Sequence, residues 1–137
     1  MNRYVLDACA LIALLQDEKG ADEVADVFEA AENGTAAITM HKLNLLEVYY
    51  KAYRTHGKER ANHMLEGFKK RPVLISQEIG DELFMEAGRF KGTYTISFAD
   101  SIVLAQASIL NAELLTADHH EFDAIEKSES IRFRWIR

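Results

Sequence analysis

The chain has 137 residues, 48% of them hydrophobic, with one proline, seven glycines and a formal net charge of −6. This length and composition predict a single globular domain over residues 1–137 and exclude a disordered or collagen-like chain. No apolar run approaches the ~18 residues needed to span a bilayer, and no secretion signal opens the chain, so we expect a cytoplasmic protein without membrane contact.

Short strand-like runs alternate with helical patterns along the chain, which indicates an α/β fold with a central, mostly parallel sheet. In chain order we predict strand 3–6, helices 8–16 and 21–32, strand 36–40, helices 41–55 and 58–70, strand 73–75, helices 78–90 and 98–110, and strands 113–116 and 131–135. The helix at 98–110 is apolar on nearly all sides, so we expect it to be a buried crossover element.

Four acidic residues stand at the end of an apolar run or within one, where carboxylates are rare unless they are paired or bind a metal ion. They are Asp7, Glu47, Asp100 and Asp118. Asp7 and Asp118 follow predicted strands, and the carboxyl ends of parallel strands form the rim at which open α/β folds bind ligands. If the four acids converge there, the chain carries a divalent-cation site.

Convergence of these carboxylates would require a compensating charge. Two like charges ~6 Å apart repel by roughly 3 kcal/mol at an effective dielectric constant of ~20. Because whole domains are stable by only ~5–15 kcal/mol, a cluster of four must be protonated, counter-charged or loaded with a cation. Oxygen ligands favour hard cations, so such a site would hold Mg²⁺ or Mn²⁺.

Helix capping is the main alternative explanation for the three aspartates. Asp7 directly precedes a predicted helix, and Asp118 together with Glu121 resembles another helix start. Ser97 and Asp100 have the spacing of a capping box. Each aspartate therefore has a structural explanation beside the functional one.

Glu47 has no capping role because it lies in the middle of a predicted helix. We expect its carboxylate to point inward, since it falls on a largely apolar helix stripe. The other members of that stripe are Leu43, Leu46 and Tyr50. The structural alternative for Glu47 is a buried ion pair with Lys51 or Arg89.

The order and spacing of these motifs make the chain resemble PIN-domain ribonucleases, and more narrowly the VapC toxins of type II toxin–antitoxin pairs. The resemblance is carried by VLDACALI (5–12), LLEVYY (45–50), FADS (98–101) and LTAD (115–118). It implies a three-layer α/β/α PIN-like fold in which the four acids hold Mg²⁺ or Mn²⁺. It also implies an endoribonuclease that cleaves RNA phosphodiesters with a metal-activated water, forms a homodimer and is inhibited by a small antitoxin.

The same resemblance assigns Thr116 a hydrogen bond inside the acidic pocket. The family often has a small polar residue within two positions of its first aspartate, whereas this chain has Ala8 and Cys9. Ser97 and Ser101 are the candidates to replace that group, and Ser97 is equally explained as a helix cap. The departure leaves a non-catalytic PIN-fold interaction module as an alternative, beside a housekeeping RNA-processing nuclease without an antitoxin.

A basic segment runs from residue 51 to residue 71 and carries a net charge of +5, against −11 for the rest of the chain. It is explained either as a solvated helical face or as a phosphate-contacting patch in which Arg54, Lys58 and Lys70 bind RNA. Three tyrosines lie just before or within it, at positions 49, 50 and 53. We interpret them as core or dimer contacts, with base stacking as the alternative.

Overall fold

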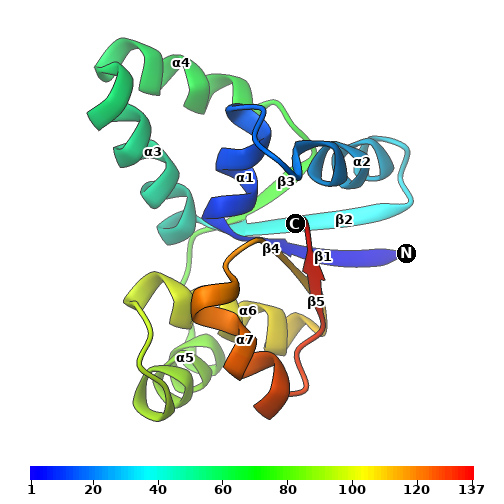
Figure 1. Cartoon of the computed structure of the whole chain (residues 1–137), viewed down its shortest axis with the longest axis vertical. Helices are drawn as coiled ribbons and strands as arrows, with labels where there is room; N and C mark the ends of the chain where they lie inside the picture. The colour runs from blue at the N-terminus through cyan, green and yellow to red at the C-terminus, as the bar shows by residue number, and fades with distance from the viewer.

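The computed structural model describes residues 1–137, which form three layers with a parallel sheet between two groups of helices (Figure 1). The strands are β1 (Asn2–Leu6), β2 (Ala36–His41), β3 (Val73–Ser76), β4 (Glu113–Thr116) and β5 (Phe133–Trp135). They lie in the order β3-β2-β1-β4-β5, and every neighbouring pair is parallel. The predicted α/β/α architecture with a parallel sheet is therefore confirmed.

Seven helices cover the two faces of the sheet. They are α1 (Ala8–Leu15), α2 (Ala21–Glu32), α3 (Lys42–His56), α4 (Lys58–Lys69), α5 (Asp81–Thr93), α6 (Phe98–Leu110) and α7 (His119–Ser128). Helices α1 to α4 lie on one side of the sheet and α5 to α7 on the other (Figure 1). None of them combines the length and the apolar character needed to cross a membrane.

Both faces of the sheet are buried, as the alternation of side chains along β1 requires. Tyr4 and Leu6 point into the hydrophobic cluster beneath α1 and α2, and Val5 points into the cluster formed with α5, α6 and α7. Every residue from position 101 to position 107 of α6 is buried. The prediction of a buried crossover helix is thus confirmed.

The structure departs from the predicted element boundaries around α5. This helix begins and ends three residues later than expected. Gly80 has an extended backbone conformation, and the carbonyl of Glu78 bonds with Nε2 of His41 at 3.0 Å, so these residues do not join the helix. Gly88 and Gly92 remain helical and do not end it. Strand β5 is also shorter than predicted, beginning only at Phe133.

The last residues of the chain tie the N-terminal half of the fold to the start of α7. The backbone N–H of Ile136 donates to the Thr116 carbonyl at 3.0 Å, and the Arg137 guanidinium donates to the Lys19 carbonyl at 2.6 Å. The Arg137 carbonyl bonds with Nε2 of His119 at 2.8 Å. This C-terminal segment therefore holds in place the turn that carries Asp118.

We predict that Gly20→Ala destabilises the fold more than Gly34→Ala. Both glycines have positive φ, +97° and +80° respectively, so either substitution strains the backbone by about 1–2 kcal/mol. At Gly20 a Cβ would also lie 2.7 Å from the Ile136 carbonyl oxygen, whereas the space around Gly34 is open. Urea unfolding should show an additional loss of about 1–3 kcal/mol for Gly20→Ala. Equal losses in the two variants would contradict the close approach.

Candidate functional site

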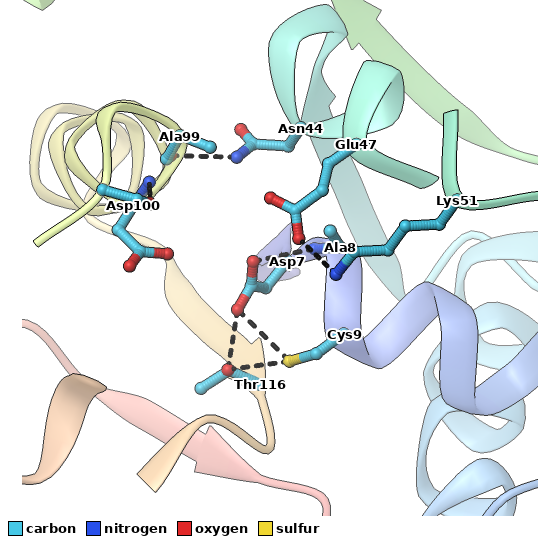
Figure 2. A network of polar contacts seen from close by, with 10 residues as sticks. Asp7, Ala8, Cys9, Asn44, Glu47, Lys51, Ala99, Asp100 and Thr116 are labelled. Carbon is cyan, nitrogen blue, oxygen red and sulfur yellow. Dashed lines mark hydrogen bonds and ion pairs between the residues drawn. The ribbon is translucent and has the colours of Figure 1, made fainter. Parts of the chain in front are cut away.

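Asp7 lies at the junction of β1 and α1, at the carboxyl end of the central strand. Its side chain is only 5% exposed. One carboxylate oxygen accepts a hydrogen bond from the Ala8 N–H at 2.7 Å, and the other accepts from the Thr116 hydroxyl at 2.8 Å (Figure 2). The cap predicted for Asp7 is present, and so is a contact with the neighbouring strand β4.

The other acids reach the same rim from three different elements. Glu47 projects from α3, Asp100 stands in the first turn of α6, and Asp118 caps α7 by accepting from the Glu121 N–H at 3.2 Å. The carboxylates of Asp7, Glu47 and Asp100 point toward a common space (Figure 2). No three His, Cys, Asp or Glu side chains of the structure are grouped closely enough to hold a metal ion by themselves.

The pKa values of two of these carboxyl groups are raised, because their ionised form is unfavourable in the folded protein. Burial, with a smaller contribution from the charge of Glu47, raises the pKa of Asp7 to about 6 in spite of its hydrogen bonds. Burial together with the charge of Asp7, and to a lesser extent that of Asp118, raises the pKa of Asp100 to about 7. Neither Asp7, Asp100 nor Asp118 forms a salt bridge. Uncompensated oxygen ligands of this kind fit a hard divalent cation.

The helix stripe predicted to point inward with Glu47 is only partly buried. Leu43 packs against the core, but Leu46 and Tyr50 are 53% and 42% exposed, so the prediction is wrong for these two. The fully buried residues of α3 are Asn44, Leu45 and Val48. The Glu47 carboxylate is half-buried beside Asp7 and pairs with Lys51 at 3.1 Å. The alternative pairing with Arg89 is also wrong.

Arg89 instead pairs with Glu86 of its own helix, α5, at 2.7 Å and with Glu129, which follows α7, at 2.9 Å. Core packing, one of the two interpretations of the tyrosines on α3, is wrong for Tyr50 and Tyr53, which are 42% and 48% exposed. The other interpretation, a dimer contact, stays a prediction.

Cys9 has a role that the sequence did not reveal. Its sulfur lies 3.3 Å from an Asp7 carboxylate oxygen and 3.3 Å from the Thr116 hydroxyl, and it accepts the Ala117 N–H at 3.3 Å. Burial and then the charge of Asp7 raise the pKa of the Cys9 thiol to about 12, so the thiol remains protonated and can donate to Asp7. The thiol thus joins the Asp7 carboxylate to the residues that follow β4.

The two serines expected to replace that group have other partners. Ser97 caps α6 by accepting the Asp100 N–H at 3.0 Å, as the capping pattern predicted. The Ser101 hydroxyl donates to the Phe98 carbonyl at 2.6 Å. Ser97 therefore lies next to Asp100, and Ser101 is engaged within its own helix.

Asn44 is a further site-forming residue that sequence analysis missed. It is almost completely buried in α3, and its amide donates to the Ala99 carbonyl at 3.0 Å (Figure 2). This bond joins the helix of Glu47 to the helix of Asp100, directly beside the latter residue. The available signal was an asparagine one turn before Glu47 in an apolar helix segment, because a buried amide needs a partner.

A parallel α/β/α fold with acidic residues at its strand ends defines the general class of this protein. The sequence matches the family model of the PIN domain over residues 4–128, and the chain belongs to that family. Membership supports nuclease, and hence hydrolase, activity. A comparison with curated protein sequences gives no match.

Solved structures share this fold over most of the chain. VapBC2 from Rickettsia felis, solved bound to a DNA fragment from its promoter, matches with a TM-score of 0.74 and 20% identity over 96% of this chain and 97% of its own. VapBC-1 from nontypeable Haemophilus influenzae matches with a TM-score of 0.73 and 19% identity over 98% of each chain. VapC20 from Mycobacterium tuberculosis, a sarcin–ricin loop cleaving toxin, has a TM-score of 0.63 and 13% identity over 81% of this chain and 86% of its own. At these identities the matches establish the common fold.

We predict that, in EDTA, the folded protein becomes more stable as pH falls from 8 to 5. In the folded protein the pKa values of Asp7 and Asp100 are about 6 and about 7, whereas the value for an unfolded chain is 3.8. The folded state therefore binds more protons than the unfolded state between these values, and stability is lost as the pH rises through 6 and 7. Asp7→Asn keeps the helix cap and should add about 1–3 kcal/mol at pH 8. It should also reduce the dependence of the melting temperature on pH. Asp26→Asn, an exposed change on α2, is the matched control, and a flat wild-type profile would contradict the prediction.

We predict that Cys9→Ala lowers stability by about 1–2 kcal/mol, because it leaves the Ala117 N–H without its acceptor and removes one donor from Asp7. Cys9→Ser keeps a donor and an acceptor at this position and should stay closer to wild type. Denaturant unfolding of the three proteins at one pH measures the difference. The same stability for both variants would show that the thiol contacts do not contribute.

Proposed function

We propose that the protein is a Mg²⁺- or Mn²⁺-dependent endoribonuclease, and that residues 1–137 act as one PIN-like domain. The observation that carries this proposal is the set of uncompensated carboxylates on one rim of the sheet, where burial raises the pKa of both Asp7 and Asp100. Family membership supports nuclease activity independently of that geometry.

Asp7, Asp100 and Asp118 are the proposed direct or water-mediated metal ligands, with Glu47 completing the set. When bound, a divalent ion supplies a water of lowered pKa and neutralises charge on the phosphodiester. The chain supplies the orientation of the ligands. Thr116 and Cys9 fix the rotamer of Asp7, and Ser97 fixes the first turn of α6 around Asp100.

The proposed partners are an RNA substrate, a small cognate antitoxin and a second copy of the chain. A toxin–antitoxin complex from Klebsiella pneumoniae shares this fold, and VapC20 is described as a toxin that cleaves the sarcin–ricin loop, so these structures support a toxin with an antitoxin partner. Arg54, Lys58 and Lys70 are the proposed phosphate contacts. Cytoplasmic location remains an expectation from the apolar pattern of the sequence, and homodimerisation remains an expectation of the family resemblance.

A non-catalytic interaction module is the competing function, and its motivation was the missing polar residue after Asp7. The Cys9 thiol contacts Asp7 and Ala117, so a polar group is present at this position, and the loss of metal-dependent cleavage in Asp7→Asn would separate an enzyme from an interaction module. A housekeeping nuclease is distinguished from a toxin by the growth of cells that express the protein. A toxin arrests growth when it is expressed alone, and co-expression of its antitoxin restores growth.

We predict that the purified protein cleaves RNA in Mg²⁺ or Mn²⁺ and that EDTA abolishes cleavage. Asp7→Asn and Asp100→Asn should each reduce the single-turnover rate at least about 100-fold, because each removes several kcal/mol of charge stabilisation at the site. Gel analysis of a labelled RNA measures the rate. Asp26→Asn should cleave like wild type, and undiminished activity of Asp7→Asn or Asp100→Asn would contradict the assignment.

A further inference from the structure

One face of α3 leads outward from the carboxylates and combines charge with an aromatic ring. Glu47, Tyr50, Lys51 and Arg54 are spaced three and four residues apart, so they lie on a common helix surface. Lys51 contacts Glu47 at 3.1 Å, and the Arg54 guanidinium lies 5.3 Å from the centre of the Tyr50 ring. From Glu47, helical rise places Tyr50 about 4.5 Å and Arg54 about 10.5 Å farther along the axis.

The three tyrosines of α3 have different environments. Tyr49 donates its hydroxyl to Asn62 of α4, and its ring lies 6.1 Å from that of Tyr53. These two tyrosines therefore form a pair directed toward α4. Tyr50 pairs with no other aromatic ring, is 42% exposed and has the Arg54 guanidinium over its ring.

An exposed tyrosine at this position has no role in the core, because α3 packs through Asn44, Leu45 and Val48. Its surroundings suit a nucleotide. Bases that have left a helical stack pack on aromatic rings, and arginine and lysine contact the adjoining phosphates. Helix α3 begins at the end of the sheet that carries Asp7 and runs away from it (Figure 1). An RNA strand bound along this face of α3 therefore reaches the carboxylates.

We propose that Tyr50 is a specificity-determining stacking platform for an unpaired base next to the scissile phosphate, with Arg54 contacting a neighbouring phosphate. This inference rests on the proposed ribonuclease function and names the residue that would hold the base beside the cleavage position. A base inside a duplex is already stacked on both faces, so it is not available to Tyr50.

The test is equilibrium binding of a single-stranded RNA that carries 2-aminopurine, measured in EDTA and in an Asp100→Asn background so that no cleavage occurs. Tyr50→Ala should weaken binding about 5- to 100-fold, the range found when a stacking aromatic is truncated. It should also abolish the fluorescence quenching of the 2-aminopurine that is stacked on the ring. Tyr50→Phe should keep both the affinity and the quenching.

Tyr53→Ala is the matched control, because Tyr53 is a similarly exposed tyrosine on the same helix that faces its neighbour Tyr49. It should bind RNA within about 2-fold of the background. Unchanged binding by Tyr50→Ala, or equal losses for Tyr50→Ala and Tyr53→Ala, would overturn the stacking role while Mg²⁺-dependent cleavage by the wild type still upholds the ribonuclease. Wild-type protein that neither binds nor cleaves RNA would overturn both.

Discussion

The charge of Asp7 is the constraint around which the rim of the sheet is organised. The carboxylate is nearly inaccessible to water, and it is held by the N–H of Ala8, the hydroxyl of Thr116 and the thiol of Cys9. These three bonds lower its pKa, yet burial outweighs them and the value remains at about 6. The folded protein therefore retains an unfavourable charge that its own hydrogen bonds only partly stabilise. Strain of this electrostatic kind at one point of a fold is typical of a functional site.

Parallel topology explains why residues far apart in sequence meet at this point. Strand β1 lies between β2 and β4, so the segments that leave these three strands all start at one edge of the sheet. Asp7 follows β1 directly, Asp118 follows β4, and Glu47 lies in the second turn of α3, the helix that follows β2. Asp100 arrives separately at the start of α6, and the amide of Asn44 fixes that helix against α3. The pairing of β1 with β2 and β4, together with the hydrogen bond between α3 and α6, thus sets the separation of the four carboxylates.

The parts of this arrangement that depend on local periodicity could be predicted from sequence, and the parts that depend on tertiary contacts could not. The strands, the buried helix α6 and the rim position of Asp7 and Asp118 follow from alternation, apolar content and the rule for parallel strand ends. The burial of α3 was mispredicted because its neighbours occupy the side opposite to the one chosen. The contacts of Cys9 join positions more than 100 residues apart, since its partners Thr116 and Ala117 lie on β4 and the following turn. No pattern near Cys9 contains that information.

Glu47 differs from the other acids in how its charge is compensated, which gives the four carboxylates unequal roles in the proposed site. Its partner Lys51 is 49% exposed and Glu47 itself 27%, and ion pairs at such exposure contribute only about 0–1 kcal/mol. Glu47 can therefore exchange Lys51 for another cation at little cost, and the freed lysine would lie on the face of α3 that carries Tyr50. Asp7 and Asp100 have no such partner to lose, so a bound cation relieves the largest unfavourable charge at these two residues. In the proposed site, cation affinity should accordingly depend more on Asp7 and Asp100 than on Glu47.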